Sequence, residues 1–126
     1  MRHLTLLCSA LLLLLCNCHE DANEDVARRQ GRMAEISAEV DDLIEDKSCN
    51  GADDCASIAW GSKPCGGPWS YLIYAPGNVD VPQLEQLVEE YNQIQEEVNQ
   101  LTGAVSDCAL VPEPEVECAD NVCREL

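Results

Sequence analysis

The chain has 126 residues, of which 24 are acidic and seven are basic, and its formal net charge is −17. This charge excludes a nucleic-acid-binding protein, because contact with phosphates requires a positive surface. The only histidines are His3 and His19, so a histidine-activated nucleophile and a histidine-rich metal site are not expected. We therefore expect no enzyme, no cofactor and no metal site.

The N-terminal segment starts with Arg2 and continues as an apolar run from Leu4 to Leu15. A membrane-spanning helix requires about 20 residues, so this run is too short for a permanent span. It ends next to two cysteines, Cys16 and Cys18. Together these features resemble the signal peptide of a bacterial lipoprotein precursor, over residues 1–17.

The resemblance implies that Cys18 carries the lipid. Leu15 lies three residues before Cys18 and Asn17 directly before it, which fits the family pattern better than the leucines around Cys16 do. Cys16 remains the alternative, and a secretory signal without a lipid is the other one. A lipoprotein would be held in the cell envelope by its lipid, with the outer membrane as the favoured location, and its other partner would be an envelope or extracellular protein.

Residues 18–31 are predicted to form an acidic tether, and residues 32–126 a single domain. Helical spacing of apolar residues predicts a leading acidic helix over 32–47. Gly31 lowers the helix propensity before this segment, so we expect the regular helix to begin near Arg32. The residues that carry the pattern are Met33, Ile36, Val40, Leu43 and Ile44.

Two short strands are predicted next, over 55–60 and 70–74, because both segments contain branched or aromatic residues. The intervening residues, 61–68, contain three glycines and two prolines and must form a loop. We expect the strands to pair as a hairpin across this loop.

The clearest helix is predicted over 81–102. Asp80 is a suitable N-cap, with Gln83 as the partner of a capping box, and Val79 and Leu84 have the spacing of a hydrophobic staple. Gly103 follows the last apolar residue, where a left-handed C-cap is expected.

The C-terminal part is predicted to contain a third strand over 107–111, an interruption at Pro112 and Pro114, and a terminal hairpin over 116–124. The predicted fold is therefore α+β. Four or five antiparallel strands form a small sheet on the 81–102 helix, and the acidic helix precedes it.

Six cysteines follow the predicted signal segment, and an even number in an exported domain predicts three disulfides. Three of them precede the 81–102 helix and three follow it, so bridges across the helix are expected, although 15 pairings are open. They are Cys49, Cys55, Cys65, Cys108, Cys118 and Cys123.

The 61–69 loop is the candidate binding surface. Glycine, proline and cysteine restrict such a loop, and exposed aromatic residues on a rigid loop are typical of recognition surfaces. The alternative is that the aromatic residues only fill a core that lacks phenylalanine. The candidate binding residues are Trp60, Lys63, Trp69 and Tyr71.

Two metal-site patterns are weaker. Residues 46–54 have the oxygen spacing of the first half of a calcium loop, but Ser57 stands where the loop needs glutamate, so an Asn-Gly turn is favoured. The cysteine spacings 49–55 and 118–123 are loose for zinc, and an oxidising compartment favours disulfides.

These features predict a non-catalytic cell-envelope lipoprotein with a binding or structural role. The alternative function is inhibition of exported proteases through the 61–69 loop. Lys63 would be the residue recognised by a trypsin-like enzyme, although Pro64 after it disfavours a substrate-like cut.

Overall fold

A computed structural model describes the backbone of residues 2–126 and the side chains of residues 22–126. It contains two long helices, α1 (Arg2–Leu43) and α2 (Val81–Thr102), and two hairpins. The strands are β1 (Ala56–Trp60), β2 (Ser70–Tyr74), β3 (Val116–Ala119) and β4 (Val122–Glu125), and short 3₁₀ helices cover Ala52–Asp54 and Pro76–Asn78. The predicted α+β class is confirmed.

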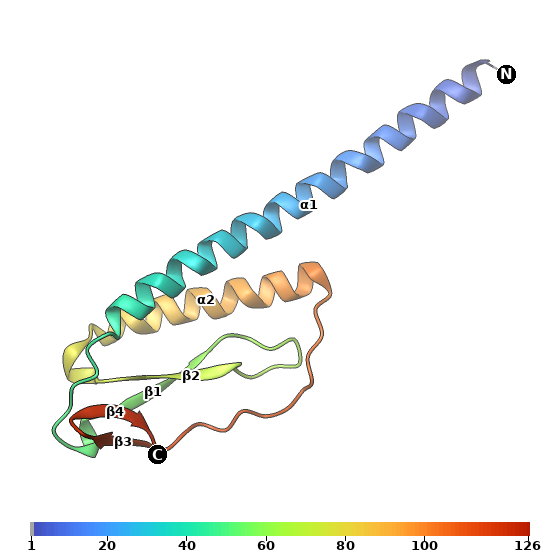
Figure 1. Cartoon of the computed structure of the whole chain (residues 1–126). Coiled ribbons are helices and arrows are strands. Elements are labelled where there is room, and N and C mark those ends of the chain that lie inside the picture. Colours follow the sequence, from blue (N-terminus) through green and yellow to red (C-terminus); the bar gives the residue numbers. More distant parts are fainter. Residues whose placement is uncertain (1) are drawn as a thin grey trace.

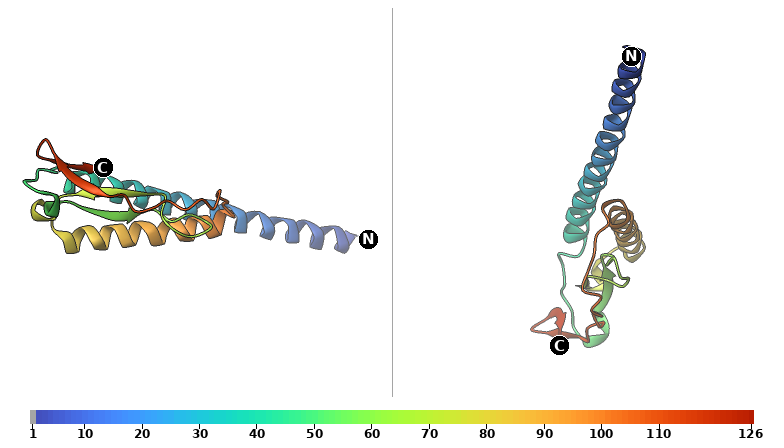
Figure 2. Two further views of the ribbon diagram at one scale, coloured as in Figure 1. Left: turned by 90° about the horizontal axis from the view of Figure 1, so that it is seen from below. Right: turned by 90° about the vertical axis from the view of Figure 1, so that its right-hand side faces the viewer.

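The two helices lie side by side on one face of the β1–β2 hairpin, and the β3–β4 hairpin lies beyond the hairpin's other face (Figures 1 and 2). The first part of α1 projects beyond the rest of the molecule in all views. The buried core lies between α1, α2 and the β1–β2 hairpin, and consists of Ile36, Val40, Ile44, Tyr74, Leu84, Leu87 and Val88.

Helix α1 differs from the prediction at both ends. It continues through the predicted tether and through Gly31, and it ends at Leu43 rather than at Lys47. Arg29 and Arg32 form ion pairs with Glu97 and Glu90 of α2, so α1 is bound to α2 on both sides of Gly31. These contacts explain how the helix tolerates a residue of low helix propensity, because packing outweighs a loss of about 1 kcal/mol.

Helix α2 has the predicted limits. The Asp80 carboxylate accepts the backbone N–H of Gln83 at 3.1 Å, and Gly103 adopts the left-handed conformation with φ of 64°. Val79 packs against the core cluster that contains Leu84, as the staple predicts. Both ends of this helix are thus set by local sequence signals.

The β1–β2 hairpin is antiparallel and pairs Ala56 with Tyr74 and Trp60 with Ser70. The alternation of side chains in a strand divides the hairpin into two faces. Ile58, Trp60 and Leu72 pack on the core cluster, whereas Ile73 packs on the cluster formed by the buried cysteines.

The prediction of a third strand over 107–111 is wrong. Residues 103–115 form an irregular segment that we call the tail. Cys108 has a positive φ of 54°, and the Asp107 carboxylate accepts the N–H of Ala109 at 3.1 Å, so this stretch is a turn. Pro112 and Pro114 lack the N–H groups that a strand ladder needs.

The tail therefore separates the two hairpins, and the single sheet of four or five strands becomes two sheets of two strands. The predicted terminal hairpin does form, with Cys118 opposite Cys123 and both Asp120 and Asn121 at positive φ in its turn. It is connected to the residues after α1 by an isolated bridge between Ser48 and Val122.

All six cysteines after Cys18 form disulfides, and each bridge joins a cysteine before α2 to one after it. The pairs are Cys49–Cys118, Cys55–Cys123 and Cys65–Cys108. Because Cys118 and Cys123 are opposite each other in the terminal hairpin, the first two bridges are neighbours. Three disulfides in so small a body indicate an oxidising compartment, extracellular or in the cell envelope.

Within the described residues, no helix is at once long enough and apolar enough to cross a bilayer. Cys16 and Cys18, the two candidates for the lipid, lie outside the residues whose side chains are described.

Candidate binding surface

The 61–69 loop is fixed to the body at several points. Cys65 is bonded to Cys108 in the tail. Within the loop, the N–H of Lys63 donates to the carbonyl of Gly67 at 2.9 Å and the N–H of Gly66 to the carbonyl of Lys63 at 2.8 Å. The loop is therefore a turn closed by its own hydrogen bonds and by a disulfide, so ordering it on binding costs little entropy.

Three amide side chains of α2 hold the start of the loop. Asn92 accepts the N–H of Gly61 at 2.6 Å, and Gln95 accepts the N–H of Ser62 at 2.5 Å. Asn99 donates to the carbonyl of Ser62 at 2.8 Å. These residues lie three and four positions apart on the helix, so they form one polar row that faces the loop.

Gly61 is required where it stands. Its φ is 82°, and an added Cβ would lie 2.8 Å from Oε1 of Gln95 and 2.9 Å from Cδ1 of Trp69. A side chain at this position would push apart the loop, α2 and Trp69, so the tryptophan sits directly against the backbone at the end of β1.

Lys63 is buried, with 5% of its surface exposed. Its ammonium group donates to the carbonyl of Ala109 at 2.8 Å, lies 3.4 Å from the carboxylate of Asp107 and lies 5.1 Å from the ring centre of Trp69. The N–H of Ala109, and after it the Lys63 ammonium, lower the pKa of Asp107 below its usual 3.8. Lys63 thus joins the loop to the tail, and its position gives no support to the protease-inhibitor alternative.

The structure places Trp60 apart from the other candidate residues. Its ring stacks on Tyr91 of α2, with centroids 3.8 Å apart and an interplanar angle of 21°. Burial in this contact raises the pKa of Tyr91. Trp60 therefore lies on the core face of the hairpin. For this residue, the alternative that the aromatic side chains fill the core is correct.

Trp69 and Tyr71 lie together on another part of the surface. With residues of the tail they line a shallow hollow of about 190 Å³. Trp69 is 45% exposed, and Leu110, which precedes Val111 in the tail, is 93% exposed. The other residues that line the hollow are Val111, Pro112 and Pro114 of the tail, Ser70 of β2 and Glu125 of β4.

Such a hollow, with a half-exposed tryptophan at its edge and prolines in its wall, can bind an apolar side chain of a partner at low entropic cost. The sequence pattern predicts a strand that includes Val111 and an interruption at the prolines, and it contains nothing that connects these residues with Trp69. The amide row of α2 was also missed, although the spacing of Asn92, Gln95 and Asn99 was visible in the sequence.

The calcium-like segment is a turn. Asp54 accepts the N–H groups of Asn50 and Gly51 at 2.8 and 3.0 Å, and Asp46 accepts the N–H of Ser48 at 3.0 Å. A hydrogen bond from the Ser48 side chain, and after it this backbone bond, lowers the pKa of Asp46. Both carboxylates therefore serve the backbone, as an Asn-Gly turn requires.

The sulfur atoms of Cys49, Cys55 and Cys123 lie within 4.8 Å of one another. All three belong to disulfides, and a disulfide sulfur is not the thiolate that binds zinc. The arrangement reflects the two neighbouring bridges.

Comparisons with protein-family models, with curated proteins and with solved structures find no match to this chain.

Proposed function

We propose that this protein is a lipid-anchored component of the cell envelope that binds a protein partner without catalysing a reaction. The lipid is on Cys18, and the partner binds at the hollow beside Trp69. The observation that carries the binding role is a half-exposed tryptophan that lines a surface hollow together with Tyr71 and two prolines. The loop that ends at this tryptophan is held by a disulfide, a buried lysine and three side-chain amides.

The anchor is supported by the apolar run that ends at Cys16 and Cys18 and by the compartment that the disulfides indicate. Arg29, where α1 is paired with Glu97 of α2, lies eleven positions after Cys18. At 1.5 Å per residue this is about 16 Å of helix. In the proposed arrangement, the body therefore stands close to the membrane on a short helical stalk.

The anchor is tested by expressing the chain in a bacterial host and comparing Cys18→Ser with Cys16→Ser. Cys18→Ser should leave the protein unprocessed or release it to the soluble fraction, and intact-mass measurement of the wild type should show diacylglycerol on Cys18. Cys16→Ser should remain in the membrane fraction. A mature wild-type chain that begins elsewhere and carries no lipid contradicts the anchor.

The binding surface is tested by placing a photo-crosslinking amino acid in cells at Ser70, an exposed residue that lines the hollow, and, as a control, at Asp41, which is exposed on α1. The proposal expects one discrete crosslinked protein from position 70 and none of that mass from position 41. The same crosslink from both positions, or from neither, contradicts the surface.

A further inference from the structure

A second surface lies between the loop and α2 and includes no residue of the tail. A groove of about 640 Å³ runs between α2 and the end of β1 with the loop that follows it. Its apolar lining includes Ile58, Pro68 and Val88, and three carboxylates of α2 line it as well, those of Glu85, Glu89 and Glu96. The groove therefore combines an apolar floor with a row of negative charge on one wall.

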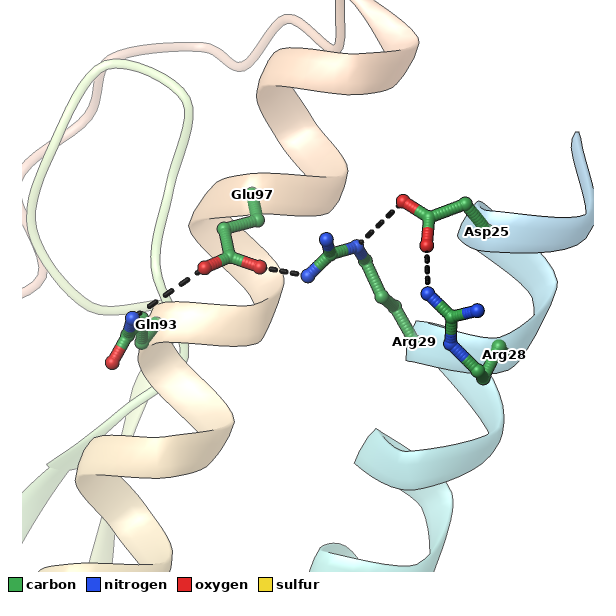
Figure 3. A network of polar contacts seen from close by, with 5 residues as sticks. All are labelled: Asp25, Arg28, Arg29, Gln93 and Glu97. Carbon is green, nitrogen blue, oxygen red and sulfur yellow. Dashed lines mark hydrogen bonds and ion pairs between the residues drawn. The ribbon is translucent and has the colours of Figure 1, made fainter. Parts of the chain in front are cut away.

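Most positive charge in the body is already paired. Arg29 bridges Asp25 of its own helix and Glu97 of α2, and Arg28 also pairs with Asp25 (Figure 3). Arg32 pairs with Glu90 of α2, at 2.8 Å between Nε and Oε1. Arg32 also pairs with Glu35 and Glu39 of its own helix. The remaining pairs are Lys63–Asp107, Arg124–Glu117 and Arg124–Asp120.

The groove carboxylates are left out of this pairing. Among residues 22–126, no ion pair includes Glu85, Glu89 or Glu96. All three side chains are exposed, and Glu96 accepts one hydrogen bond, from Gln100 at 3.4 Å. Glu85 also contributes to the raised pKa of Tyr74, after burial. Negative charge is therefore retained along this wall of the groove.

The groove is not a site where a strand of another protein would pair with the free edge of β1. β1 pairs only with β2 among the described strands. However, the carboxamide of Asn92 accepts the N–H of Gly61 at 2.6 Å and donates to the carbonyl of Ala59 at 3.4 Å, in the way that a neighbouring strand would. A ligand of this end of the groove is thus recognised through side chains rather than through the β1 backbone.

We infer that the groove binds an extended, lysine- or arginine-bearing segment of another protein. Glu85 and Glu89 are four residues apart, which is about 6 Å along a helix. Basic side chains two residues apart in an extended chain are about 6.6 Å apart, so two of them face these carboxylates together. The methylene stems of lysine and arginine suit the apolar floor, while their charged ends reach the carboxylates.

The test uses the full-length protein in detergent and a fluorescein-labelled ten-residue peptide of alternating lysine and valine, with binding followed by fluorescence anisotropy. The triple variant Glu85→Gln, Glu89→Gln, Glu96→Gln should raise the Kd at least about tenfold. The control variant Asp41→Asn, Asp42→Asn, Glu45→Gln removes the same charge from exposed positions at and beyond the end of α1, and should change the Kd less than about twofold.

A single substitution gives an independent reading. Gln93→Lys places a cation in the groove and should weaken binding as strongly as the triple variant, whereas Gln83→Lys adds the same charge to the exposed start of α2 and should not. Thermal unfolding shows that each variant is folded. Trp69→Ala should leave peptide binding unchanged, which separates this site from the proposed partner surface.

Three results overturn the inference. The lysine–valine peptide fails to bind, both triple variants weaken binding equally, or a lysine–serine peptide binds as tightly as the lysine–valine peptide. The second result would show attraction to net charge alone, and the third would show that the apolar floor is not used.

Discussion

The ammonium group of Lys63 donates a hydrogen bond of 2.8 Å to the carbonyl oxygen of Ala109, across 46 positions of sequence. This bond, the Lys63–Asp107 ion pair and the Cys65–Cys108 bridge link the loop directly to the turn of the tail. The tail residues that line the Trp69 hollow, Val111, Pro112 and Pro114, begin two positions after Ala109. The shape of the candidate binding surface therefore depends on a buried amine.

Lys63→Met should destabilise the protein by about 1–3 kcal/mol, because it keeps the apolar stem but removes the partner of the Ala109 carbonyl and of Asp107. Urea unfolding measures this change. Asp107→Asn is the matched control. It removes the carboxylate of a side chain that is 70% exposed and should have a smaller effect. A larger loss in Asp107→Asn than in Lys63→Met would show that the ion pair, not the carbonyl bond, holds the lysine.

The two tryptophans should respond differently to replacement by alanine. Trp60→Ala empties a core site stacked on Tyr91 and should reduce the free energy of unfolding by about 3–5 kcal/mol. Trp69→Ala removes a half-exposed ring and should reduce it by about 1–2 kcal/mol, from lost contact with Gly61 and Lys63, while it abolishes partner binding. Partner binding that survives in a folded Trp69→Ala variant removes this hollow from consideration.

The Arg32–Glu90 pair should make the contact between the two helices sensitive to acid. Hydrogen bonding to Arg32 lowers the pKa of Glu90 below its usual 4.5. The folded state therefore holds the proton less tightly than the unfolded state, so protonation favours unfolding. The contribution of the pair is present above pH 4.5 and is lost as the pH falls through the lowered pKa.

A double-mutant cycle isolates this effect from the relief of general charge repulsion that acid also brings. The coupling between Arg32→Met and Glu90→Gln should be constant from pH 7 to about 5 and should decline at lower pH. A coupling that does not change between pH 7 and pH 3 contradicts the assignment of Glu90.

The parts of the fold that were predicted correctly are those that depend on residues close together in the sequence. The Asp80 cap and Gly103 define α2, and Asp120-Asn121 defines the turn of the terminal hairpin. The pairing of the six cysteines depends on how α2 brings the tail back across the hairpin, which no local pattern contains. The strand predicted over 107–111 failed for the same reason, since the Ala109 carbonyl is bound by a lysine far away in sequence.

The candidate site was predicted only in part. The composition of the 61–69 loop predicts a candidate site, but composition does not distinguish between the aromatic residues in and beside the loop. Alternation in β1 already separates Trp60, which faces the core with Ile58, from Ser57 and Ala59. The burial of Lys63 could not be predicted from the sequence. A lysine in a glycine-proline loop is ordinarily solvated, and its burial follows from the tail that only the folded chain brings to it.

Graded reduction should open the Cys65–Cys108 bridge first. Both of its cysteines are exposed, whereas Cys49 and Cys123 are buried in the other two bridges, and thiol–disulfide exchange requires access to a sulfur. Native protein should show no free thiols among the six body cysteines on alkylation without reductant. After treatment with a low concentration of reductant, alkylation should label Cys65 and Cys108 before the other cysteines, as mass spectrometry of the peptides would show.

Replacing Cys65 and Cys108 by serine should lower the unfolding free energy by roughly 2–4 kcal/mol. It should also weaken partner binding, because the bridge holds the tail wall of the Trp69 hollow. Replacing Cys55 and Cys123 should destabilise the protein by a similar amount but leave the hollow intact in the folded fraction. Equal loss of partner binding in the two folded variants would mean that the Cys65–Cys108 bridge has no special role at the site, and labelling of Cys49 or Cys123 before Cys65 would contradict the order of reduction.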